Sequence, residues 1–104
     1  MATQDLIRVG SSGFTLEAVL LIDGQPADIS NATLLELRLE KPDSTTVHKV
    51  AQLGTTGLDG LVVYLVQPGD IDQAGAWRYQ FDVATPTFRY PLDPVAFTVG
   101  GNIP

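Results

Sequence analysis

Apolar and polar residues alternate along several short stretches of this chain, and that pattern predicts an all-β protein. The clearest stretch is 76–83, where Trp77, Tyr79 and Phe81 occupy alternate positions. A period of two is typical of a half-buried strand, because successive side chains point to opposite faces. The preceding residues, 68–75, are rich in Pro, Asp and Gly and predict a turn. We therefore expect the three aromatic side chains to lie in the core.

Six further stretches carry a strand pattern and are separated by turn signals. Short strands at this spacing, with no convincing helix beyond one turn near 69–73, are typical of a β-sandwich. The sequence therefore predicts an immunoglobulin-like antiparallel β-sandwich of about seven strands. The six stretches are 5–9, 14–22, 35–40, 45–52, 61–66 and 88–99.

Three of these stretches carry details that refine the prediction. Leu and Glu alternate in 35–40; both are good helix formers, but the strict alternation and the early Pro42 favour a strand. The 45–52 stretch is polar and carries Lys49, which favours a position at a sheet edge. Prolines interrupt the last stretch, which resumes at Val95 and is therefore expected to lie at an edge or to contain a bulge.

The length of 104 residues is that of a single domain, which we expect to span 1–104, with its core in 5–99 and a C-terminal tail at 100–104. There is no cysteine, so packing alone must hold the domain together. Residues 1–5 lack the basic and apolar segments of a signal peptide. The apolar runs are too short to cross a bilayer, so we expect no membrane partner.

Twelve acidic and six basic residues give a net charge of −6. Nucleic-acid binding requires clustered Lys and Arg to neutralise phosphates, whereas the basic residues here are scattered along the sequence. We therefore interpret the acidity as a contribution to solubility and expect no nucleic-acid partner.

Few residues suggest chemistry. The single histidine, His48, lies in the polar edge stretch, and no serine occupies the Gly-x-Ser-x-Gly motif of a nucleophile elbow. Asp70 and Asp72 form an Asp-x-Asp pair that could bind calcium together with Asp59. Calcium, however, needs six to eight oxygen ligands. Aspartates in turns commonly accept hydrogen bonds from the backbone instead. We expect no metal, no cofactor and no enzymatic activity.

Apolar residues on the expected outer faces of two strands are more informative. Suppose that Leu16 and Leu20 point into the core from the 14–22 stretch, and Leu61 from the 61–66 stretch. The residues at the intervening positions of each stretch then point outward, because side chains alternate between the two faces of a strand. The second and fifth strands pair in an immunoglobulin-like sheet, so these outward residues would form one patch. Such a patch is typical of a contact surface, unless the N-terminal segment or a loop covers it. The predicted protein interface comprises Val19, Leu21, Val62, Tyr64 and Val66, with Ile103 as an anchor on the tail.

Several turns and strand faces together resemble one family. The relevant stretches are 14–20, 23–32, 37–43, 57–60 and 67–77. They are similar to the small immunoglobulin-like domains of tailed-bacteriophage structural proteins, in particular the N-terminal domain of baseplate upper proteins, which attaches receptor-binding parts to the baseplate. That domain is normally followed by a longer helical or fibre-forming region. The short tail at 100–104 departs from this pattern and leads us to expect a free-standing accessory subunit.

The resemblance implies a virion structural protein, an accessory component of the tail or baseplate that docks to other virion subunits in multiple copies. Its expected location is the virion, at the tail, baseplate or capsid surface, after assembly in the host cytoplasm. Related modules occur on capsids, so a capsid decoration (cement) protein is one alternative. A second alternative is a carbohydrate-binding module for host recognition, because Tyr64, Phe88 and Tyr90 are candidates for a sugar platform.

Overall fold

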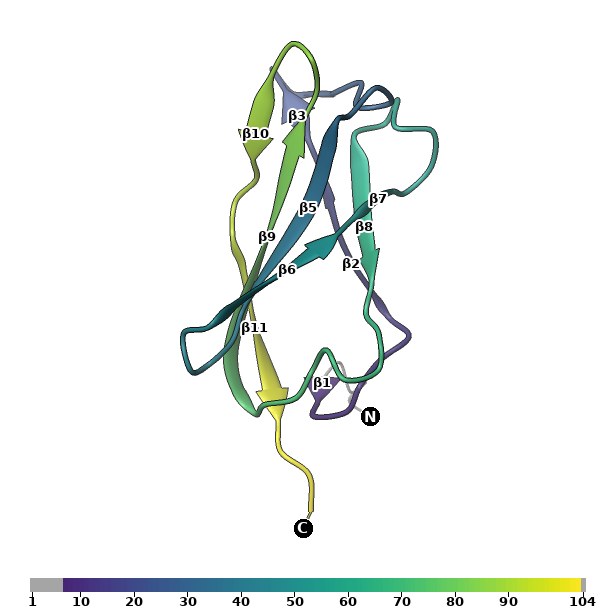
Figure 1. Cartoon of the computed structure of the whole chain (residues 1–104). Helices are drawn as coiled ribbons and strands as arrows, with labels where there is room; N and C mark the ends of the chain where they lie inside the picture. The colour runs from purple at the N-terminus through teal and green to yellow at the C-terminus, as the bar shows by residue number, and fades with distance from the viewer. Residues whose placement is uncertain (1–6, 104) are drawn as a thin grey trace.

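The computed structural model describes residues 7–103, and within this range all regular secondary structure is β-strand, as predicted (Figure 1). No helix in the described range is long and apolar enough to cross a membrane. The strands are β1 (Ile7–Arg8), β2 (Thr15–Val19), β3 (Leu21–Ile22), β4 (Gln25–Pro26), β5 (Leu34–Glu40), β6 (Thr46–Val50), β7 (Gln52–Leu53), β8 (Leu61–Leu65), β9 (Gly75–Ala84), β10 (Arg89–Pro91) and β11 (Val95–Gly100).

The predicted strands appear in the structure, but three of them are divided in two. The 14–22 stretch forms β2 and β3, the 45–52 stretch forms β6 and β7, and the 88–99 stretch forms β10 and β11. Strand β4 lies in a predicted loop and pairs with β3 through a two-residue turn. Asp23 and Gly24 in that turn have φ values of 53° and 77°, the left-handed conformation that a type I′ hairpin turn requires.

A six-stranded sheet is organised around β9. Its order is β1–β11–β9–β5–β6, and β10 pairs with the second half of β9. Strand β1 is parallel to β11, whereas the other pairs are antiparallel. The sheet is therefore mixed, and the prediction of a purely antiparallel fold is wrong. A three-stranded sheet, β2–β8–β7, and the small β3–β4 sheet complete the fold.

The core contains the aromatic face of β9, as its alternation predicts. Trp77 and Phe81 are each 1% exposed, and Tyr79 is half-buried. The Trp77 ring stacks on Phe97 of β11 at a centroid distance of 5.8 Å. Its indole Nε1 donates a hydrogen bond of 3.0 Å to the carbonyl of Gln73, which fixes the turn before β9 to the strand.

One lateral side of the molecule is closed by the chain itself. After β6, which is the edge strand of the large sheet as predicted, the chain passes through Ala51 into β7 of the three-stranded sheet (Figure 1). Ala51 is buried, and its amide donates to the carbonyl of Leu35 at 2.9 Å. This crossing joins the two sheets. On the opposite side, β2 and the β10–β11 segment belong to different sheets, and no comparable crossing joins them within the described residues.

Candidate functional site

The six residues predicted to form an interface do not lie on one surface. Val62, Tyr64 and Val66 are 0%, 8% and 1% exposed and belong to the core, so the prediction that they point outward is wrong. The reason is the register between β2 and β8, in which Leu16 is opposite Tyr64. Paired residues point to the same face of a sheet, so the inward position of Leu16 carries Tyr64 inward too. Leu65, on the other face of β8, is 50% exposed.

Tyr64 shows how a polar group is accommodated at the margin of the core. Its hydroxyl donates a hydrogen bond of 2.5 Å to Asp70, which also accepts from the Gln67 amide at 2.9 Å and lies 3.2 Å from Lys49. Burial raises the pKa of Asp70, but these hydrogen bonds outweigh it and leave the pKa below its usual value. Burial and the adjacent carboxylate raise the pKa of Tyr64.

The three aspartates considered for calcium have separate protein partners. Asp70 is held as described above, Asp72 pairs with Lys41 at 2.8 Å, and Asp59 accepts from the Thr55 hydroxyl at 2.7 Å. In residues 7–103, no group of three or more His, Cys, Asp or Glu side chains is placed to hold a metal ion. Asp70 accepts from the Gln67 amide and Asp59 from the Leu61 amide, which matches the turn-capping interpretation for these two residues, whereas Asp72 forms an ion pair instead.

Val19 and Leu21 are exposed, as predicted, with exposed fractions of 49% and 54%. They line a hollow of about 430 Å³ between β2–β3 and β10–β11, which we call the open groove. Across the hollow lie Tyr90 and Val95, each 42% exposed. Tyr90 is paired with Val83 and Val95 with Tyr79, so both extend from the inward face of the large sheet. The open groove therefore exposes part of an inner sheet face that the three-stranded sheet leaves uncovered.

The wall formed by β10 and β11 is interrupted by a bulge. The pairs that flank it are Pro91 with Asp82 and Val95 with Tyr79, so three residues of this segment face two of β9. The Leu92 amide in the bulge donates to the Phe81 carbonyl at 2.8 Å. The two prolines of the segment lack an N–H group, which agrees with the predicted break in the last strand.

Charges beside the open groove are acidic. Asp93 lines it, and Glu17 is exposed on β2 next to the lining strand residues. Burial is the main cause that raises the pKa of Tyr79, and the negative charge of Glu17 adds to it. No Lys or Arg is among the described residues that line the hollow. The site thus combines exposed apolar side chains with acidic charge.

The outer face of the large sheet has a different character. Asp82 of β9 is 0% exposed, because Arg38 of β5 and Arg89 of β10 each place an Nη2 atom 2.6 Å from its Oδ2. Hydrogen bonds from Arg89 lower the pKa of Asp82; burial acts in the opposite direction, and the charges of both arginines keep the pKa low. Glu36 accepts from Arg38 at 3.0 Å and lies 3.3 Å from His48. His48 therefore lies beside a surface network of ion pairs.

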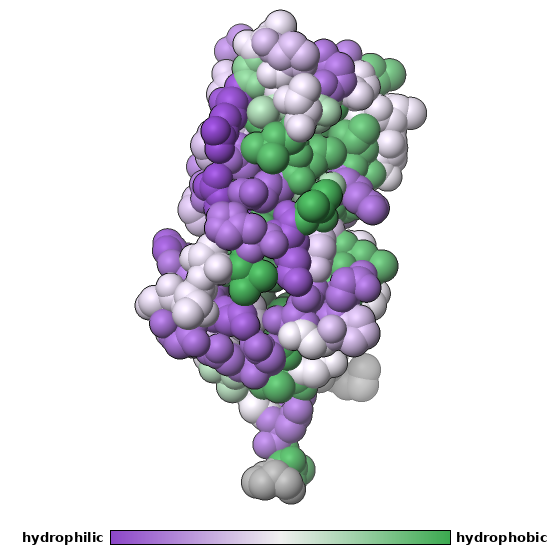
Figure 2. All heavy atoms as spheres, viewed as in Figure 1, coloured by the Kyte–Doolittle hydropathy of each residue, from purple (hydrophilic) through white to green (hydrophobic). Residues whose placement is uncertain are grey.

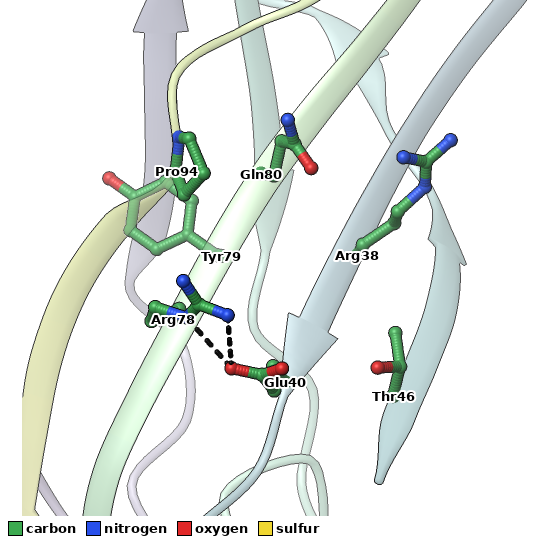
Figure 3. A pocket seen from close by; sticks show the side chains of 7 residues that line it. All are labelled: Arg38, Glu40, Thr46, Arg78, Tyr79, Gln80 and Pro94. Atoms are coloured by element: carbon green, nitrogen blue, oxygen red, sulfur yellow. Dashed lines mark hydrogen bonds and ion pairs between the residues drawn. The ribbon is translucent and has the colours of Figure 1, made fainter. Parts of the chain in front are cut away.

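A polar hollow of about 120 Å³ lies on this outer face (Figure 3). Arg78 and Glu40 form an ion pair of 2.7 Å within it, and Arg38, Gln80 and Tyr79 also contribute to its lining. Because Arg78 is paired with Glu40, and Arg38 with Glu36 and Asp82 outside the hollow, the hollow presents little unsatisfied charge to a ligand. Figure 2 shows one face of the molecule, where hydrophilic and hydrophobic side chains are interspersed and the larger green areas lie in the upper half.

The aromatic residues considered for sugar binding do not form a flat platform. Tyr64 is in the core, which corrects its assignment to the surface. The rings of Phe88 and Tyr90 are 5.4 Å apart but tilted by 57°. Tyr90 instead contributes to the open groove.

Ile103 is 95% exposed and lies on the C-terminal tail, which extends from the lower end of the molecule in Figure 1. Gly100 belongs to β11 rather than to the predicted tail. The next residues are tied to the N-terminal part of the described chain: Arg8 donates to the Gly101 carbonyl and Asn102 to the Val9 carbonyl, each at 2.8 Å. The tail up to Asn102 is therefore anchored. Pro104 lies outside the described residues.

Comparison with protein-family models finds no match for this chain, and comparison with curated proteins finds no similar sequence.

Proposed function

We propose that this chain is a structural subunit of a tailed-bacteriophage virion, an accessory tail or baseplate component that docks to neighbouring subunits through the open groove. The resemblance of its turns and strand faces to phage immunoglobulin-like domains supports this assignment. The order of its strands also supports an immunoglobulin-like sandwich. Strands β2, β8 and β7 follow the order of the B, E and D strands, and β5, β9 and β11 follow the order of C, F and G.

The observation that carries the docking proposal is the clustering of exposed apolar side chains. Val19, Leu21, Tyr90 and Val95 are all large, substantially exposed and gathered around one hollow. Contiguous patches of this kind are typical of interaction sites, and burial of each Å² contributes about 25 cal/mol. A partner subunit that covers the groove would bury them. Of the interface predicted from the sequence, the proposed docking surface keeps Val19 and Leu21. It adds Tyr90 and Val95.

Incorporation into particles tests this function. Phage particles assembled with the Val19→Lys/Leu21→Lys chain should contain much less of the protein than particles assembled with the unchanged chain. Leu65→Lys is the matched control, because Leu65 is 50% exposed in the same three-stranded sheet as Val19 but does not line the groove. Quantitative immunoblotting of purified particles provides the measurement. Normal incorporation of the double variant, or equal loss with Leu65→Lys, contradicts docking through the groove.

Capsid decoration is the alternative location for the same docking function. Electron microscopy of particles with an antibody-labelled chain distinguishes the two, because a decoration protein would label the whole capsid surface and a baseplate component only the tail tip.

A further inference from the structure

The backbone of β2 has one side that is bonded and one that is not. The Leu20 amide donates to the Gly60 carbonyl, and the Phe14 carbonyl accepts from the Val66 amide, both at 2.9 Å. In an antiparallel pair, alternate residues direct their N–H and C=O groups to the partner strand. The intervening residues, Thr15, Glu17 and Val19, therefore direct theirs away from β8. Within residues 7–103, no strand pairs with β2 on that side.

This edge lacks the protection that other edges of the fold carry. An exposed strand edge usually bears prolines, positive charges or a bulge, or is very short. Strand β6 carries Lys49, the β10–β11 segment contains two prolines and a bulge, and β1 and β7 are two residues long. Strand β2 has five residues, no proline and no lysine. Its one charge is Glu17.

The open groove lies beside the Val19 end of this unprotected edge, where Ala18 and Val19 of β2 belong to its lining. An added strand would place alternate side chains toward the inward-facing Tyr90 and Val95 and the others beside Val19 and Leu21. Strand addition of this type uses main-chain hydrogen bonds for affinity and alternate side-chain pockets for specificity. Both components are present here, since the free N–H and C=O groups of β2 lead to the end of the strand where Val19 and Leu21 are exposed in the groove.

Charge distinguishes between the possible occupants. Glu17 on the edge and Asp93 in the lining favour a strand that carries a positive charge. A second copy of this chain is a poor fit, because its net charge is −6. If two β2 strands paired antiparallel about their midpoints, Glu17 of one copy would face Glu17 of the other, and like charges directly opposite are destabilising.

We infer that the open groove binds an extended segment of another virion subunit, with apolar residues at alternate positions and at least one Lys or Arg, and that this segment adds to β2 as an extra strand. The identification of the partner as a virion subunit rests on the proposed function. The strand addition itself rests on the free edge, the exposed apolar groove and the acidic charge.

A synthetic peptide of sequence Thr-Val-Lys-Val-Thr-Val-Thr is a suitable probe, with Glu in place of Lys as its matched control. Hydrogen exchange of the full chain should slow by at least about tenfold at the amides of Thr15, Glu17 and Val19 when the Lys peptide is present at millimolar concentration. The Glu peptide should protect much less. Glu17→Lys should reverse this preference. Equal protection by both peptides, or none by either, overturns the inference.

Val19→Pro removes one free donor from the edge without removing a hydrogen bond to β8, so it should keep the fold and weaken peptide binding by about tenfold or more. Leu65→Lys should bind as the unchanged chain does. Slow exchange of the three edge amides in the free protein would mean that the chain's own N-terminal segment or a second copy already occupies the edge, and this would overturn the inference. Protection that increases with protein concentration would identify a second copy, and protection independent of concentration the N-terminal segment. A chain that enters particles but binds neither peptide is still a virion subunit, whereas the addition of a strand to β2 is overturned.

Discussion

The two lateral sides of this molecule differ in how the sheets meet. On one side, the chain itself crosses from β6 to β7, with Ala51 buried at the crossing. On the other, β2 and β10–β11 approach without a connecting strand and leave a hollow with Val19 and Val95 exposed on its walls. Side chains of similar apolar character are therefore buried or exposed according to what covers them. The proposed docking through the open groove would place a partner on the side that the chain itself leaves open.

The openness is confined to one part of that side. Farther along β11, Val99 is 2% exposed and is paired with Ile7 of β1. Trp77 and Phe97 stack between these two regions. The core is therefore continuous, and the exposed apolar residues lie beyond its margin. Substitutions can test this division, because they should have large effects in the core and small effects at the groove.

The largest effect is expected for Val62→Lys. Val62 is 0% exposed on the inner face of β8, so the variant would bury an unpaired ammonium group. We expect a loss of more than about 4 kcal/mol in the free energy of unfolding, and in practice little folded protein. Circular dichroism and urea denaturation provide the measurement. A melting temperature close to that of the unchanged chain would contradict the position of the Val62 side chain on the inner face of β8.

Trp77→Ala should have the next largest effect. The substitution removes a buried aromatic ring that stacks on Phe97 and donates to Gln73, and we expect a cost of about 3–5 kcal/mol. A loss of this size would confirm that the Trp77 ring belongs to the packed core. Urea denaturation of the variant tests the cost, and the fluorescence of Trp77 in the unchanged chain tests its burial. An emission spectrum typical of full water exposure would contradict the burial of Trp77.

Asp82→Asn should lower stability at pH 7 by about 2 kcal/mol, because it weakens charge-assisted hydrogen bonds from Arg38 and Arg89. The folded-state pKa of Asp82 is below its ordinary value of 3.8, so its contribution is present above that pH. The contribution is lost as the pH falls below about 4 and through the lower folded pKa.

The stability difference between the unchanged chain and Asp82→Asn should therefore shrink in acid. Urea denaturation at pH 7 and at about pH 3 tests this. A difference that stays constant or grows between the two pH values would show that the ionised carboxylate is not the source of the effect.

The smallest effect on stability is expected at the open groove. Val19→Lys should change the free energy of unfolding by less than about 0.5 kcal/mol, since the residue is 49% exposed and outside the core. Thermal denaturation against the Leu65→Lys control provides the measurement. A large loss of stability in Val19→Lys alone would place Val19 in the core and contradict the distinction between the two sides.

The sequence predicts the strands where polar and apolar residues separate clearly between two faces. On β9, Trp77 and Phe81 alternate with Arg78 and Gln80, and their burial is as expected. On β8, both faces are apolar, so alternation does not identify the inner one. The register with β2 does so, as does the hydroxyl of Tyr64, which needs an acceptor and finds Asp70 in the following turn.

The open groove and the buried carboxylate depend on tertiary structure and could not be read from local patterns. Tyr90 and Val95 follow an inward pattern, and their exposure arises because the opposite sheet stops short of them. Asp82 follows an outward pattern and would be expected in water. It is buried because two arginines lie over it. Arg38 of β5 is distant from Asp82 in sequence, and Arg89 of β10 follows it after a turn.

This arrangement of Asp82 has a consequence for how the chain reaches a single fold. The carboxylate holds one arginine from each neighbouring strand, so it ties together the alignment of three strands. If β9 slipped by one residue, Asp82 would turn toward the apolar interior and both arginines would lose their partner. Misaligned intermediates would thus be heavily disfavoured during folding. The contacts of Asp82 with Arg38 and Arg89 therefore favour one alignment of the three strands. Their loss should increase misfolding more than it changes the folded structure.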